Sequence, residues 1–158
     1  MIKNKSNICA IIPARKGSKG VPDKNIKIIN GRPLLAYSIK AALESSLVDR
    51  VIVSTDSQSY KKIAEDYGAE VPFIRPTEFA QDESIDIEFF QHAINWLSQN
   101  ENHIPDYFVH LRPTTPLRDP AVIDAAIVAL IDSDYTSLRS VNKMSKTAHK
   151  AFEISDNV

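Results

Sequence analysis

The amino-acid sequence predicts an α/β fold, a doubly wound and mostly parallel sheet with helices on both faces. Two short apolar runs rich in β-branched residues, at 8–12 and 50–55, are typical of buried strands. Segments with apolar residues at helical spacing follow each run, as at 33–46 and 84–98. Alternating strands and helices favour parallel strands joined by right-handed crossovers, and 158 residues suit one domain.

Local signals give the elements of the first half. A short extended stretch at 26–29 ends at the turn Asn30–Gly31, and Pro33 suits the first position of the next helix. Ser57 is a candidate cap for a second helix, which should stop at Gly68.

The second half continues the alternation. It predicts a strand at 70–74, a loop at 75–84, a helix at 84–98, a strand at 107–111 and a loop at 112–118. Asp119 and Pro120 form a cap and first-turn pair for a helix that runs to about residue 130. We expect a last strand at 135–141, whereas 143–158 has no clear period.

Composition narrows the class of protein. The chain is 43% hydrophobic and 25% charged, with a net charge of −1, which argues against a general binder of nucleic acid or membrane surfaces. Its single cysteine, Cys9, cannot form an internal disulfide and lies in the first apolar run, so we expect a buried structural thiol. No stretch resembles a signal peptide or a membrane span, so the expected location is cytoplasmic.

A basic loop follows the first predicted strand. Residues 13–25 contain two glycines, two prolines and four basic side chains, Arg15, Lys16, Lys19 and Lys24. A basic glycine-containing loop at the carboxyl end of a strand is where an open α/β sheet binds phosphate, although a solvated basic turn has the same composition. Neither G-x-x-x-x-G-K-[ST] nor G-x-G-x-x-G is present.

The order of residues in this loop carries a resemblance to a known family. The residues Ala14–Arg15, Ser18–Lys19–Gly20, Pro22 and Lys24–Asn25 follow the pattern A-R-x-x-S-K-G-x-P-x-K-N. This pattern resembles the nucleotide loop of the acylneuraminate cytidylyltransferases, which make CMP-sialic, CMP-legionaminic and CMP-pseudaminic acids. The resemblance implies a Rossmann-like nucleotidyltransferase fold that transfers CMP from CTP to an acidic nine-carbon sugar, a nonulosonic acid, and releases pyrophosphate.

The resemblance also implies roles for particular residues. Lys24 would stabilise the α-phosphate, followed in importance by Arg15 and Lys19. The triphosphate and ribose would be lined by Ala14, Arg15, Ser18, Lys19, Lys24 and Asn25. The cytosine pocket would be formed by Arg75, Ala80, Asp82 and Ser84. Asp82 and Ser84 could instead cap the helix that follows. Asp56 could face the nucleotide, or it could have a structural role by capping the helix at Ser57 or supporting a loop.

A second loop, L-R-P-T-T-P-L-R at 111–118, is similar to the family segment L-Q-P-T-S-P-L-R. By this resemblance Arg112, Thr114 and Thr115 would bind the sugar. Arg112 replaces a glutamine, and a planar guanidinium suits a carboxylate, so an acidic sugar other than sialic acid is compatible with it. Asp86 also departs from the family, which has a small or short polar residue there. We expect a structural role for Arg118, as an ion pair near Asp119.

Members of this family continue beyond the position of Val158, so the domain at 1–158 would lack the family's dimerisation arm and Asp-x-Asp metal site. The resemblance therefore implies Mg²⁺ bound through substrate phosphates and carboxylates beyond Val158, with no metal ligand in 1–158. Whole members are homodimers, and this chain alone is expected to be monomeric or weakly associated. Two alternatives stay open, an inactive CTP-binding fragment and the nucleotide-binding half of a glycosyltransferase.

Overall fold

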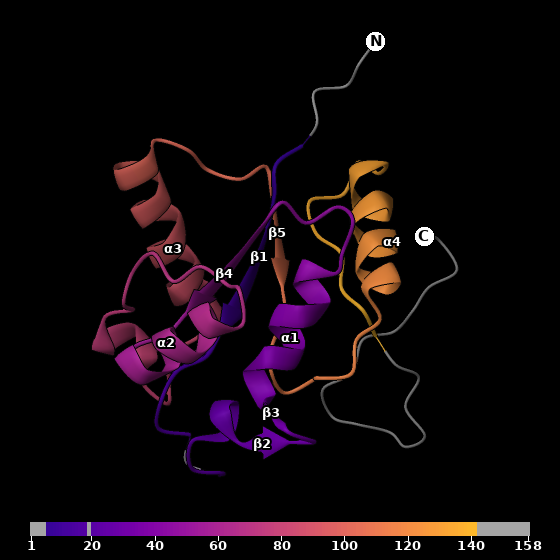
Figure 1. Ribbon diagram of the computed structural model, residues 1–158. Helices are drawn as coiled ribbons and strands as arrows, with labels where there is room; N and C mark the ends of the chain where they lie inside the picture. The colour runs from indigo at the N-terminus through magenta and orange to yellow at the C-terminus, as the bar shows by residue number, and fades with distance from the viewer. Residues whose placement is uncertain (1–5, 19, 142–158) are drawn as a thin grey trace, which may run out of the picture.

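The computed structural model describes residues 6–18 and 20–141 and has a parallel sheet at its centre (Figure 1). Strand β1 (Ile8–Pro13) lies between β4 (Arg50–Ser54) and β5 (Tyr107–His110) and pairs in parallel with both. The three strands therefore end at the same edge of the sheet, which confirms the predicted parallel arrangement.

Strand β1 is apolar along its whole length because both of its faces are covered. Successive side chains of a strand point to opposite faces. Ile8, Ala10 and Ile12 join one buried cluster, while Cys9 and Ile11 join another. This explains why the sequence shows a continuous apolar run there, without the alternation of a half-exposed strand.

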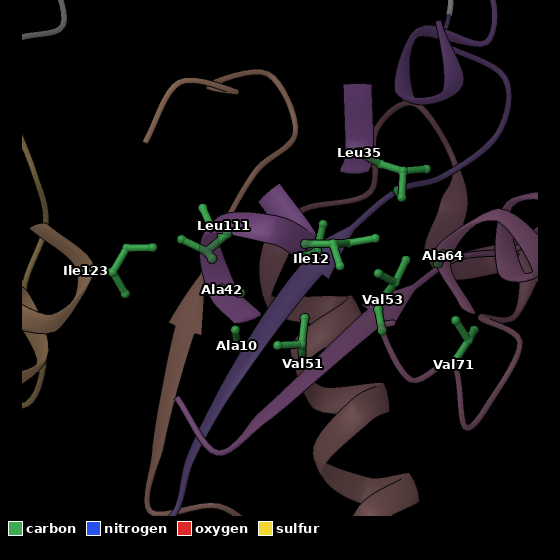
Figure 2. Close-up of a cluster of buried hydrophobic side chains, with 14 of the residues drawn as sticks. Ala10, Ile12, Leu35, Ala42, Val51, Val53, Ala64, Val71, Leu111 and Ile123 are labelled. Atoms are coloured by element: carbon green, nitrogen blue, oxygen red, sulfur yellow. The ribbon is translucent and has the colours of Figure 1, made fainter. Parts of the chain in front are cut away.

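Three helices cover one face of the sheet. They are α1 (Leu34–Leu43), α2 (Gln58–Asp66) and α4 (Pro120–Ile131). Figure 2 shows part of their shared core, in which Leu35 and Ala42 of α1 and Ile123 of α4 surround Ile12 of β1.

The opposite face is covered by α3 (Asp86–Glu101), which lies across the sheet from α1 and α4 in Figure 1. Phe89, Ala93 and Leu97 recur at helical spacing along α3 and pack on Cys9 and Ile11. Helices on both faces confirm the doubly wound fold. Among the described residues, no helix combines the length and apolarity needed to cross a membrane.

The segment that joins the basic loop to α1 contains short elements. A 3₁₀ helix, η1 (Lys24–Ile26), precedes a hairpin of β2 (Ile28–Ile29) and β3 (Arg32–Pro33). The predicted extended stretch is thus confirmed only for its second half. The hairpin turns at Asn30–Gly31, which have φ of 47° and 77°, values that asparagine and glycine tolerate best.

The helix boundaries follow the cap signals closely. Ser57 accepts a hydrogen bond from the Tyr60 amide at the start of α2, and Asp119 accepts one from the Ala121 amide at the start of α4. Gly68, with φ of 90°, ends the turn after α2. Helix α1 is shorter than predicted, since it stops at Leu43 and the following serines bond to Asp124 of α4.

Two predicted strands are wrong. At 70–74 only Glu70 bridges β4, opposite Ile52, and Pro72 lacks the amide hydrogen that a longer ladder needs. The described segment 135–141 contains no strand, since apolar side chains alone do not make a strand. The predicted loop 75–84 contains one turn of 3₁₀ helix, η2 (Thr77–Ala80).

The Cys9 thiol should be unreactive in the folded chain. The residue is 0% exposed, and burial raises its pKa to about 12. Little thiolate is present at about pH 8, near the pKa of a free thiol, so a disulfide reagent such as DTNB should label the protein only after urea unfolds it. Rapid labelling without urea, with the folded state verified by circular dichroism, would contradict this placement.

Candidate active site

A cleft of about 360 Å³ lies at the carboxyl edge of the sheet, within the size range of small-molecule sites. Three segments form its walls: the loop after β1, the stretch that leads into α3, and the loop after β5. The side chains and backbone that line it belong to Pro13, Arg15, Ser18, Gly20, Lys24, Asn25, Arg75, Phe79, Gln81, Ser84, Ile85, Asp86, Phe89, Arg112, Pro113 and Thr114. This edge is where open α/β sheets bind ligands.

The basic loop after β1 is held in shape by hydrogen bonds to neighbouring segments. The buried Asn25 side chain donates to the Arg15 carbonyl at 3.0 Å, and the Lys16 amide donates to Asp56 Oδ1 at 2.7 Å. The Tyr60 hydroxyl of α2 donates to Asp23 Oδ1 at 2.9 Å. Asp56 therefore supports the loop, which confirms one of its two expected roles, while Ser57 caps the helix.

The Arg15 side chain reaches from the basic loop to the segment 75–84, which forms another wall of the cleft. Its Nη2 lies 2.7 Å from Asp82 Oδ1, and its Nη1 donates to the Gly17 carbonyl at 3.3 Å. Asp82 thus pairs with the basic loop and does not cap α3, which has Ile85 at its cap position and the Ile85 amide bonded to Glu88. The expectation that Asp82 or Ser84 caps this helix is wrong, since Ser84 bonds within its own loop to the Glu78 carbonyl and the Gln81 amide.

Arg75 is almost fully buried, at 4% exposure, between the sheet and α3. Its guanidinium donates to the Ser54 hydroxyl at 3.0 Å and to the Ser54 carbonyl, and lies 5.2 Å from the centre of the Phe89 ring. Burial lowers the pKa of Arg75 to about 10. Arg75 therefore joins the end of β4 to α3, and much of its donor capacity is used inside the protein.

The loop after β5 is anchored by Arg118. This guanidinium donates to the Arg112 carbonyl at 2.9 Å and to Ser38 Oγ of α1 at 3.1 Å. A structural role is confirmed, but the predicted pairing with Asp119 is wrong, because Asp119 caps α4. Thr114 faces the cleft, whereas the Thr115 amide closes a turn on the Arg112 carbonyl at 3.3 Å.

One contact in the cleft has no signal in the sequence. Arg112 Nη2 bonds to Asp86 Oδ2 at the first turn of α3, and His110 Nδ1 lies 3.9 Å from the same oxygen. The His110 ring packs on Phe89 and Phe90, and burial lowers its pKa below the ordinary 6.5. Arg112 and Asp86 are 26 residues apart, so no local pattern could have paired them.

The cleft brings together most of the predicted site. The predicted site residues that line the cleft are Arg15, Ser18, Lys24, Asn25, Arg75, Ser84, Arg112 and Thr114. The predicted site residues Ala14, Ala80, Asp82 and Thr115 do not line it. Lys19 lies outside the described residues. Sequence reasoning missed Phe79, Gln81, Ile85 and Phe89 as lining residues. Ile85 and Phe89 were visible only as part of a helix period, and Phe79 and Gln81 only as part of the loop 75–84.

No group of three or more histidine, cysteine, aspartate or glutamate side chains is close enough to hold a metal ion among residues 6–18 and 20–141. Asp86 is the one carboxylate side chain among the described residues that line the cleft, and it is already paired with Arg112. The described residues therefore do not fit a resident metal.

A parallel α/β sheet with helices on both faces and a cleft at its carboxyl edge defines a doubly wound α/β protein, a class in which ligands bind at this edge. The cytidylyltransferase family model matches residues 9–158, and the chain therefore belongs to that family.

Individual relatives agree with this assignment. The chain is 41% identical over 143 residues to the N-acylneuraminate cytidylyltransferase of Escherichia coli O18:K1:H7, a match covering 90% of this chain and 33% of that protein. It is 35% identical over 151 residues to a pseudaminic acid cytidylyltransferase of Campylobacter jejuni serotype O:23/36, covering 96% and 64%. The chain thus spans about a third of one relative and less than two thirds of the other.

The fold is also found in a solved structure, that of CMP:2-keto-3-deoxy-manno-octonic acid synthetase complexed with CTP. The TM-score is 0.68 at 20% sequence identity, and the match covers 80% of this chain and 48% of that one. At this identity the likeness concerns the fold, and it agrees with the Rossmann-like nucleotidyltransferase arrangement predicted from the sequence.

Stability should fall in mild acid. Burial lowers the pKa of both His92 and His110 from 6.5, so below that value the unfolded chain binds protons that the folded chain does not. The part of the free energy of unfolding that comes from these two neutral imidazoles should therefore be retained above pH 6.5 and decrease as the pH falls below it. Urea unfolding across this range should show a smaller decrease for His110→Gln, whereas the exposed control His103→Gln should keep the wild-type slope. Equal slopes in all three proteins would contradict the prediction.

Proposed function

We propose that this protein is a CTP-dependent cytidylyltransferase that activates an acidic nine-carbon sugar, giving a CMP-sugar and pyrophosphate. One observation supports this most directly: the basic loop with Arg15 and Lys24 faces Arg112 across a single cleft. A triphosphate and a carboxylate-bearing sugar could then bind side by side. The sialic-acid and pseudaminic-acid relatives support the substrate class.

The chemistry requires positioning and fixed positive charge. A sugar hydroxyl oxygen forms a bond to the α-phosphorus of CTP while the bond to the bridging oxygen of pyrophosphate breaks, and the hydroxyl proton is released. Negative charge grows on the departing pyrophosphate. We assign Lys24 to the α-phosphate and Arg15 to the neighbouring phosphates, with Lys19 as a further cation of the same loop. Asp56, Asp23 and Asp82 keep the loop in place before the nucleotide binds.

The cytosine is proposed to bind against the segment that leads into α3. Arg75 and Ser84 line the cleft there, beside the ring of Phe79. Arg75 already bonds to Ser54, and the Ser84 hydroxyl already bonds to the Glu78 carbonyl and the Gln81 amide. The proposed contribution of both side chains is therefore mainly to fix this wall, with backbone groups proposed to meet the base edge. Ala80 and Asp82 would support the wall from behind.

Mg²⁺ is proposed to enter with CTP, bound through phosphate oxygens, because the described residues do not fit a resident metal site. The whole protein is proposed to work as a homodimer in the cytoplasm, as its resemblance to the family implies. A turnover assay that follows CMP-sugar formation from CTP, magnesium and a nonulosonic acid tests the activity. CTP binding without any turnover would favour the binding-fragment alternative.

CTP should bind more tightly than ATP or GTP. The segment 75–84 resembles a cytosine pocket and contributes Arg75, Phe79 and Ser84 to the cleft, and a wrong base would leave polar groups of such a pocket unpaired. Isothermal titration calorimetry with the three nucleotides at one magnesium concentration measures this. Equal affinity for CTP and ATP would show that the cleft reads only the triphosphate.

Lys24→Ala should weaken CTP binding by about 1.5–3 kcal/mol, the range for hydrogen bonds to charged groups, and abolish transfer. Lys27→Ala is a matched control, because Lys27 is exposed and does not line the cleft. Calorimetry on both variants measures the difference. If Lys24→Ala binds CTP as well as Lys27→Ala does, Lys24 is only a surface charge.

A further inference from the structure

The ion pair between Asp86 and Arg112 joins two walls of the cleft. Asp86 is the first residue of α3, and Arg112 follows β5. By the sequence resemblance described above, both are positions that differ from the family pattern, with arginine in place of glutamine and aspartate in place of a small or short polar residue. The structure brings these two departures into direct contact, so they form one feature of the site.

The pair is poorly explained as a device for stability. The Arg112 and Asp86 side chains are 57% and 42% exposed, and ion pairs at such exposure contribute little to folding. The helix macrodipole favours an acidic residue at the start of α3, but it does not require that residue to bind Arg112. The reason for the pair is better sought in the ligand.

A carboxylate such as Asp86 also lowers the affinity of a cleft for anionic ligands, because it repels them. The basic side chains that line the cleft are Arg15, Lys24, Arg75 and Arg112. Asp86 would repel both a triphosphate and a sugar carboxylate unless its charge were compensated. Arg112 makes a direct ion pair with Asp86, whereas His110 Nδ1 lies 3.9 Å from the same oxygen, so the compensation comes mainly from Arg112.

Arg112 keeps most of its capacity for a ligand. A guanidinium has five N–H donors in a rigid fork, and Asp86 is its sole side-chain hydrogen-bond partner within residues 6–18 and 20–141. Without Asp86 this exposed side chain would sample many rotamers, and fixing it on binding would cost entropy. A guanidinium that is already held in one orientation can bind a carboxylate through two parallel hydrogen bonds.

We propose that Asp86 is a positioning residue for the sugar substrate, which holds the Arg112 guanidinium so that its remaining donors bind the carboxylate of the acidic sugar. This inference rests on the proposed function and deepens it. Asp86 acts through Arg112, and the pair selects acceptors that carry a carboxylate over neutral sugars of the same shape.

The test is equilibrium binding of N-acetylneuraminate, pseudaminic acid and legionaminic acid, each compared with its uncharged methyl ester, to the 158-residue chain. The wild type should prefer at least one acid over its ester by about tenfold or more, the effect of losing a charge-assisted hydrogen bond. Asp86→Ala should lower affinity for that acid about tenfold and CTP affinity much less, while Asp86→Asn should recover most of the loss because an amide oxygen still accepts from Arg112.

The variants also test whether Asp86 acts through Arg112. Asp86→Ala/Arg112→Ala should lose no more acid affinity than Arg112→Ala alone, because nothing remains for Asp86 to position. Glu83→Ala removes an exposed negative charge from the neighbouring loop, outside the cleft lining, and should match the wild type. Melting curves verify that each variant is folded.

Three outcomes would overturn the inference: equal binding of acid and ester by the wild type, an acid affinity that is unchanged or improved in Asp86→Ala, or additive losses in the double variant. The CTP binding measurements test the proposed function separately. A wild-type chain that binds CTP no better than ATP counts against the cytidylyl assignment, whereas CTP selectivity with an unaffected Asp86→Ala counts only against the role of Asp86.

Discussion

The parallel pairing of β1 with both β4 and β5 is the constraint on which the site depends. Because all three strands point the same way, the loops that follow them emerge at one edge of the sheet. Hydrogen bonds continue the pairing past the strand ends, from the Ala14 amide to the Ser54 carbonyl and from the Leu111 amide to the Ile11 carbonyl. The basic loop and the Arg112 loop are therefore fixed close to each other before any ligand binds.

Three carboxylates hold the basic loop in place at that edge of the sheet. Asp23, Asp56 and Asp82, from three different segments, each hold part of the basic loop or its Arg15 side chain. Asp82 pairs directly with the Arg15 cation, and all three contacts hold the loop without filling the cleft, since none of the three carboxylates lines it. The net charge of −1 agrees with a local positive cleft on a nearly neutral chain.

Much of the fold was predictable because its signals are local. The apolar run of β1, the cap at Ser57 and the turn at Asn30–Gly31 each depend on neighbouring residues, and the structure confirms them. The segments 70–74 and 135–141 were predicted wrongly as strands. A strand exists only when another strand pairs with it, and that partner is not written in the segment itself.

In the site, too, some features follow from neighbouring residues in the sequence and others depend on distant partners. The sequence by itself determined the basic loop, with Arg15 and Lys24, and its position after a buried strand. The tertiary structure decided what each charge contacts, including Asp82, 67 residues from Arg15, and Asp86, 26 residues from Arg112. The physical reason is that an ion pair acts over a few ångströms in space and carries no sequence period, so only the packing of α3 against the sheet brings these partners within reach.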